Sequence, residues 1–134
     1  MLAVDKSLSN ILAGKDDEVI QAVKDLANAN PEFIYEAKNP SYRGQCFYVE
    51  DGKPSCIVGQ ALAKLGLTID QLSLFDNEVT GDISAEAVGK VLGLNDITRT
   101  WLRDVQASQD AGLRWAAAVA RADGTPVPLM DYKV

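Results

Sequence analysis

The sequence predicts a mostly helical α+β domain in which a small antiparallel β-hairpin packs on a long C-terminal helix. Gln45–Gly66 combines a strand-like alternation, an Asp-Gly turn and a helical apolar pattern. Residues 96–122 carry apolar side chains at helical spacing over the longest such span in the chain. A length of 134 residues predicts a single domain, 1–134, with residues 123–134 as an extended C-terminal tail.

The hairpin is expected to turn at Asp51-Gly52, because both residue types tolerate positive φ. A two-residue loop pairs Glu50 with Lys53, which places opposite charges beside the turn. A three-residue loop pairs Val49 with Lys53 instead. Both registers fit the sequence. Pro54 lacks an N–H, so the return strand is expected to be short and to lie at an edge.

The two cysteines of the chain flank this turn. The three-residue loop places Cys46 opposite Cys56, whereas the two-residue loop places Cys46 opposite Ile57 and predicts no bridge. The N-terminus lacks the apolar core of a secretory signal, so we expect two free, largely buried thiols and a cytoplasmic location. An enzyme that uses Cys46 or Cys56 as a nucleophile or redox pair is an alternative, since Cys56 lies near the N-terminus of a predicted helix. The chain has no histidine to serve as its base.

Apolar periodicity and capping residues predict the remaining elements. The expected helices span residues 5–13, 16–27, 56–65, 68–75, 85–92 and 96–122. Gly59 lies inside the helix after the hairpin, which indicates close backbone packing there. We interpret Glu32 to Ala37 as a third strand against the hairpin, because Phe33 and Tyr35 alternate with Ile34.

The long helix is expected to bury one stripe and expose the opposite face. The stripe consists of Ile97, Trp101, Val105, Ser108, Gly112, Trp115 and Val119. The opposite face carries Arg99, Arg103, Asp110, Arg114 and Arg121. The predicted core comprises Val49, Ile57, Leu62, Leu65, Leu92, Trp101, Val105, Trp115 and Val119.

Composition argues against several classes of function. A net charge of −6 disfavours general affinity for nucleic acid or anionic membranes. No apolar run reaches the length of a membrane-spanning helix. We find no catalytic constellation, metal motif or phosphate-binding loop, so we expect no catalytic residue, no metal and no cofactor.

Two segments resemble a known group of proteins. They are C-F-Y-V-E-D-G-K-P-S-C-I-V-G-Q-A-L-x-x-L-G, from Cys46 to Gly66, and V-Q-A-S-Q-D-A-G-L-R-W-A-A-A-V, from Val105 to Val119. Both look like segments of uncharacterised small cytoplasmic proteins encoded by actinobacterial phages of the mycobacteriophage type. The resemblance implies a phage product that acts in the bacterial host cytoplasm, and it implies no catalytic residue.

These observations favour a phage accessory protein that acts as a protein-binding module on a host or phage protein. Tyr42 and Arg43, in a loop beside the hairpin, are candidate binding residues. The tail adds Leu129, Met130 and Tyr132, which could dock on a partner or exchange between the protomers of a homodimer.

A helix-turn-helix DNA-binding protein is the second alternative. Residues 85–103 have the rhythm of that motif, with Gly93 in the turn. Arg99 and Arg103 would project from its second helix toward a groove of DNA. The acidic net charge argues against this alternative.

Overall fold

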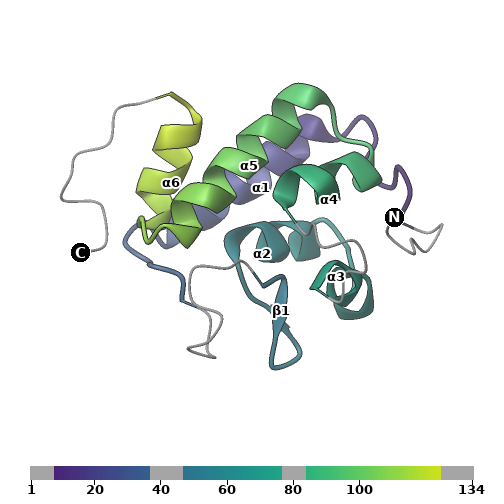
Figure 1. Ribbon diagram of the computed structural model, residues 1–134, viewed down its shortest axis with the longest axis horizontal. Coiled ribbons are helices and arrows are strands. Elements are labelled where there is room, and N and C mark those ends of the chain that lie inside the picture. The colour runs from purple at the N-terminus through teal and green to yellow at the C-terminus, as the bar shows by residue number, and fades with distance from the viewer. Residues whose placement is uncertain (1–7, 37–46, 77–83, 125–134) are drawn as a thin grey trace.

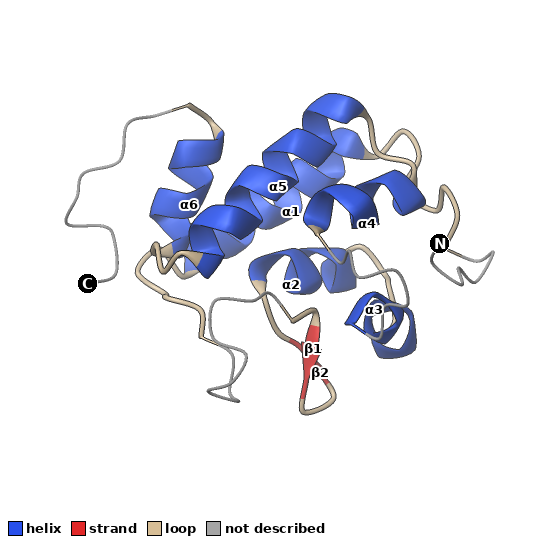
Figure 2. Ribbon diagram, in the orientation of Figure 1, coloured by secondary structure: helices blue, strands red, loops and turns tan. Residues whose placement is uncertain are grey.

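The computed structural model of the chain describes residues 8–36, 47–76 and 84–124 (Figure 1). Its helices are α1 (Asp16–Ala29), α2 (Ile57–Lys64), α3 (Ile69–Asp76), α4 (Ala85–Leu92), α5 (Asp96–Asp110) and α6 (Trp115–Ala122). Strands β1 (Val49–Glu50) and β2 (Lys53–Pro54) form a small antiparallel sheet (Figure 2). The predicted mostly helical α+β fold with a hairpin is therefore confirmed.

Helix α5 runs through the middle of the molecule and packs against α4, α6 and α2, while α1 packs against α2 (Figure 1). Seven predicted core residues are buried: Ile57, Leu62, Leu92, Trp101, Val105, Trp115 and Val119. Val49 and Leu65 are half-buried and pack against that core. The hairpin and α3 lie together below α5 in this view.

The predicted helix over 96–122 is two helices, because α5 ends at Asp110 and α6 begins at Trp115. Gly112 adopts a φ of 98°, and its N–H bonds back to the carbonyl of Gln109 at 3.0 Å. The next N–H, of Leu113, reaches the carbonyl of Ser108 at 3.1 Å. This pair of bonds is the Schellman arrangement that ends helices at a left-handed glycine. The chain then folds back, so that α6 packs on α5.

The predicted third strand is wrong, since the described part of that segment, residues 32–36, forms no strand. The backbone carbonyls of Phe33 and of Pro31, just before this segment, bond to the start of α6 instead. The N–H of Trp115 donates to the Phe33 carbonyl at 2.9 Å, and the N–H of Ala116 donates to the Pro31 carbonyl at 3.1 Å. The first N–H groups of a helix have no partner within it, so this segment serves as the cap of α6.

The hairpin has the two-residue loop, with Glu50 opposite Lys53 and Val49 opposite Pro54. Asp51 and Gly52 have φ values of 54° and 73°, as the primed turns of tight hairpins require.

Gly59 brings α2 against the hairpin. A Cβ at this position would lie 2.6 Å from the carbonyl oxygen of Tyr48. The expected close backbone packing is confirmed.

The expected helix over 5–13 does not form in its described part. Residues 8–14 make turns, and Asn10 has a φ of 58°. The N–H groups of Asn10 and Leu12 donate to the carbonyls of Val91 and Leu92, both at 2.9 Å. The segment therefore donates hydrogen bonds to the last carbonyls of α4 and does not form a helix of its own. Its Leu8 and Leu12 side chains are buried.

The prediction of two free thiols is wrong, because Cys56 is disulfide-bonded. Cys46, the other cysteine of the sequence, lies outside the described residues. The register argument fails because the regular ladder does not extend to Cys56. Ser55 and Cys56 donate in succession to the carbonyls of Tyr48 and Phe47, each at 2.9 Å, and Cys56 is already the N-cap of α2. The pairing of residues across the two strands therefore does not predict the position of the Cys56 sulfur.

Candidate functional site

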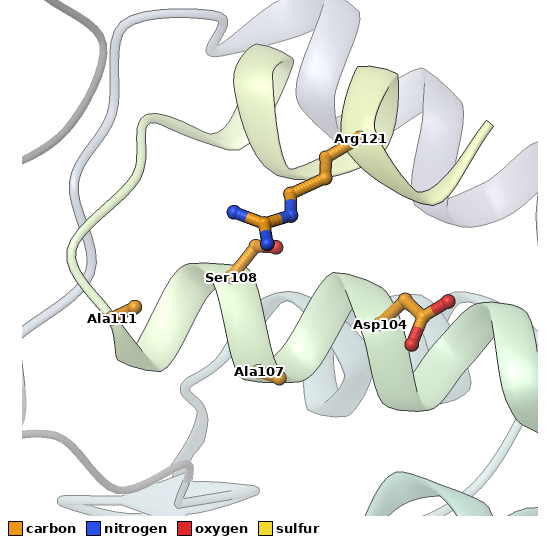
Figure 3. Close-up of a pocket in the computed structure, with 5 residues that line it drawn as sticks. All are labelled: Asp104, Ala107, Ser108, Ala111 and Arg121. Carbon is orange, nitrogen blue, oxygen red and sulfur yellow. The ribbon is translucent and has the colours of Figure 1, made fainter. Parts of the chain in front are cut away.

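A groove runs along the outer side of α5, where α6 lies against it (Figure 3). One hollow of about 370 Å³ is lined by Asp104, Ala107, Ser108, Ala111 and Arg121. A second of about 370 Å³ is lined by Asp96, Ile97, Thr100, Trp101, Asp104 and Ala122. Asp104 borders both hollows, and we call the two together the α5/α6 groove.

Small side chains make the groove concave. Ala107 and Ser108 on α5, and Ala111 at its C-cap, line the hollow where a long side chain would fill the space. Figure 3 shows Arg121 reaching from α6 over Ser108, with Asp104 further along α5. A carboxylate and a guanidinium therefore border a hollow whose floor consists of small side chains.

The end of α6 is fixed beside the groove by Asp123. The indole Nε1 of Trp101 donates to Asp123 Oδ1 at 2.8 Å. Asp123 Oδ2 also lies 3.4 Å from Lys24 Nζ on α1. The buried Trp101 ring thus anchors the last turn of α6 against α5 and α1.

Ile97 is the exception to the predicted stripe, since its side chain is 80% exposed. It lies in the first turn of α5, beyond the point where α6 ends at Ala122. No other large apolar side chain in the described residues is exposed as far. Its expected burial assumed one continuous helix, and the fold-back of α6 leaves the first turn of α5 uncovered within the described chain.

Arg99 has a structural role in the α4–α5 corner. Its Nη1 donates to the carbonyl of Leu94 at 3.2 Å, and its guanidinium pairs with Asp96. Its Cγ lies so close to Gly89 that a Cβ there would approach it to 2.9 Å. The side chain is only 24% exposed. A residue held in this way is poorly placed to leave for a ligand.

Arg103 is more exposed but lies among acids. Its Nη2 is 3.3 Å from Asp104 Oδ1, and its Nη1 is 3.7 Å from Glu86 Oε2. Helices α4 and α5 do have the order of a helix-turn-helix. The carboxylates beside both predicted DNA-contacting arginines oppose the approach of a phosphate backbone.

The other predicted binding residues lie outside the described residues. They are Tyr42, Arg43, Leu129, Met130 and Tyr132. The structure therefore brings together none of the predicted binding residues except Arg99 and Arg103, which share one helix.

A hydrogen-bonded cluster joins the 32–36 segment to the hairpin. The Tyr35 hydroxyl donates to Glu50 Oε1 at 2.9 Å, and Ser55 Oγ donates to the same oxygen at 2.8 Å. The Tyr35 and Ser55 hydroxyls lie 3.0 Å apart. Burial, together with the neighbouring Glu50 carboxylate, raises the pKa of Tyr35 to about 12. A phenol that stays protonated in this way is suited to holding two segments together.

Asp76, at the end of α3, fixes the first strand. Its two carboxylate oxygens accept the N–H groups of Tyr48 and Val49, each at 2.9 Å. Burial raises the pKa of Asp76 from its ordinary value, although these two bonds act in the opposite direction. The Asp76 carboxylate thus accepts two backbone N–H groups that, in a larger sheet, would donate to an adjacent strand.

The described residues contain no group of three cysteine or acidic side chains placed to hold a metal ion. In the same part of the chain, the helices are too short or too polar to cross a bilayer. No protein-family model, curated protein or solved structure matches this chain. The functional argument therefore rests on the geometry of the groove.

None of the groove residues was predicted as a site, because Ile97, Trp101 and Ser108 were expected to lie on a buried stripe. The signal that could have found them is Gly112-Leu113. The same Gly-Leu pair ends α2 at Gly66-Leu67 and α4 at Gly93-Leu94, and each leucine is buried. A third such pair indicates a third helix end, and a helix end at that place predicts the fold-back that forms the groove.

Proposed function

We propose that this protein is a protein-binding module whose docking surface is the α5/α6 groove. The observation that carries the proposal is the 80% exposure of Ile97, which lines one end of the groove together with Trp101 and Ala122. Exposed apolar side chains beside a concavity are typical of surfaces that bind other proteins. The groove is long and bordered by two helices, a shape that suits a peptide or a helix better than a compact metabolite.

The proposal includes a biological setting. The resemblance of Cys46–Gly66 and Val105–Val119 to phage proteins supports an accessory factor that acts on a host or phage protein. The disulfide at Cys56 weighs against a strongly reducing compartment, since such bonds are rare in the cytosol. The binding role does not depend on the compartment.

The test is a comparison of three tagged full-length chains used to capture proteins from an actinobacterial lysate: the wild type, Ile97→Asp and Leu74→Asp. Leu74, on α3, is 38% exposed and serves as the matched control. We expect a specific protein to be retained by the wild type and Leu74→Asp and lost with Ile97→Asp, while circular dichroism shows all three folded. Equal capture by all three variants would rule out the groove as the docking surface.

A further inference from the structure

The outer face of α5 carries a stripe with the spacing of a helix-pairing surface. Ile97, Thr100, Asp104, Ala107 and the C-cap residue Ala111 follow one another at intervals of three and four residues, and none of them is buried. At about 100° per residue they lie within an arc of about 80°. Figure 1 shows α5 in front of α1, with α4 and α6 on its two sides. Alternating intervals of three and four residues are those by which one helix packs along another.

The stripe is complementary to itself when it is reversed. Ile97 precedes Asp104 by two helical turns and Ala111 follows it by two, so each lies about 10 Å from Asp104 along the helix. A twofold axis through Asp104 that pairs two α5 helices antiparallel therefore places Ile97 of one copy against Ala111 of the other.

The two ends of the stripe differ in the way that such a pairing requires. Ile97 is 80% exposed, whereas Ala111 lines a hollow of about 370 Å³ together with Ala107 and Ser108. The isoleucine of each copy would thus enter the hollow of the other. In an isologous interface the same patch is used by both copies, so every contact of this kind is made twice.

The charges of the groove are compatible with this pairing. Asp104 Oδ1 lies 3.3 Å from Arg103 Nη2, and Asp96 pairs with Arg99. These two acids are therefore balanced within each chain, although the chain has a net charge of −6. The Asp104 carboxylates of the two copies would meet at the axis, where Arg103 and Arg121 of both copies supply the opposite charge.

We propose that the α5/α6 groove binds a second copy of this chain, in a twofold dimer with antiparallel α5 helices and with Ile97 against Ala111 of the second copy. The inference rests on the proposed function, because it names a partner for the same groove. The reciprocal fit distinguishes a second copy from any other helical partner, since only a copy must match the stripe in reverse.

The first test is sedimentation velocity of the full-length wild type and of three variants over a range of concentrations. We expect the wild type and the control Leu74→Asp to sediment as dimers, and Ile97→Asp and Ala111→Glu to sediment as monomers. Ile97 and Ala111 are both exposed, so these variants should stay folded, which circular dichroism checks. A wild type that remains monomeric would overturn the proposal, as would a dimer that survives either groove substitution.

A second test determines the register. An isotope-labelled full-length chain with p-benzoylphenylalanine at position 97 is mixed with unlabelled wild type, irradiated and digested with trypsin. We expect a cross-link to the unlabelled peptide 104–114, and none when the probe stands at position 74. A product confined to the labelled chain, a cross-link to another unlabelled peptide, or no product would overturn the antiparallel dimer. Capture of a lysate protein that is lost with Ile97→Asp would still support the binding function in that case, so the two ideas fail separately.

Discussion

The side-chain oxygen of Gln109 on α5 accepts the backbone N–H of Ile57, the first residue of α2, at 2.9 Å. The same oxygen accepts the indole N–H of Trp115 at 3.2 Å. Gln109 is fully buried. One side chain thus caps α2, whose own N-cap residue Cys56 makes no side-chain cap bond, and also fixes the first residue of α6.

Gln109→Leu should therefore destabilise the fold well beyond an ordinary loss of a hydrogen bond. The substitution leaves two buried donors without an acceptor, at a cost of about 1–3 kcal/mol each. Gln21→Leu is the matched control, since Gln21 is exposed and bonds to Asp25 within α1. Denaturant unfolding of both variants measures the difference. Equal stability of the two would show that Gln109 does not have this capping role.

Alanine substitutions at two glycines within helices, Gly59 and Gly89, test the packing of these helices. A Cβ at Gly59 would lie 2.6 Å from the Tyr48 carbonyl oxygen, whereas one at Gly89 would meet the flexible Cγ of Arg99 at 2.9 Å. Gly59→Ala should cost about 1–3 kcal/mol, because backbone must move. Gly89→Ala should change stability by less than about 1 kcal/mol, since the gain in helix propensity offsets the shift of Arg99. Thermal unfolding compares them, and a more harmful Gly89→Ala would contradict the packing of α2 on the hairpin.

Tyr35 should ionise late in the folded protein. Its pKa is raised to about 12 from 10.0, so the stability it contributes is fully present below pH 10.0 and is lost as the pH rises through about 12. In a spectrophotometric titration, Tyr35→Phe should lose a component near pH 12. A wild-type titration identical in shape to that of the variant would mean that Tyr35 is not held as the structure shows.

The raised pKa of Asp76 predicts that protein stability depends on pH in the acidic range. Its folded-state pKa lies above the ordinary value of 3.8, so protonation is easier in the folded chain than in the unfolded one. The contribution of Asp76 is therefore largest below pH 3.8 and is lost as the pH rises through the raised pKa. Urea unfolding of the wild type and Asp76→Asn should show the wild type gaining stability relative to the variant between neutral pH and pH 4. A wild type that loses stability relative to Asp76→Asn as the pH falls to 4 would contradict this.

The elements that sequence predicts well are those with local signals. The Asp51-Gly52 turn, the glycine ends of α2 and α4, and the Ser84 and Asn95 caps are set by nearby residues. The Ser84 and Asn95 side chains accept the N–H groups of Ala87 and Thr98, as N-caps do.

The failures involve partners distant in sequence. The 32–36 segment has a strand-like alternation, but the carbonyl of Phe33, with that of Pro31 just before the segment, caps α6, about 80 residues away. The apolar spacing from Ile97 to Val119 continues across the turn at Gly112, so periodicity alone hides the break between α5 and α6. The groove depends on that break and could not be predicted without it.

The most direct test of the binding surface is an isoleucine-methyl NMR spectrum of the full chain, recorded with and without the captured partner. Ile97 lies at the groove, whereas Ile57 and Ile69 lie on α2 and α3 and serve as internal references. Docking in the α5/α6 groove predicts that the Ile97 resonance shifts or broadens while the Ile57 and Ile69 resonances keep their positions. An unchanged Ile97 resonance with shifts at Ile57 or Ile69 would place the partner away from the groove and contradict the account.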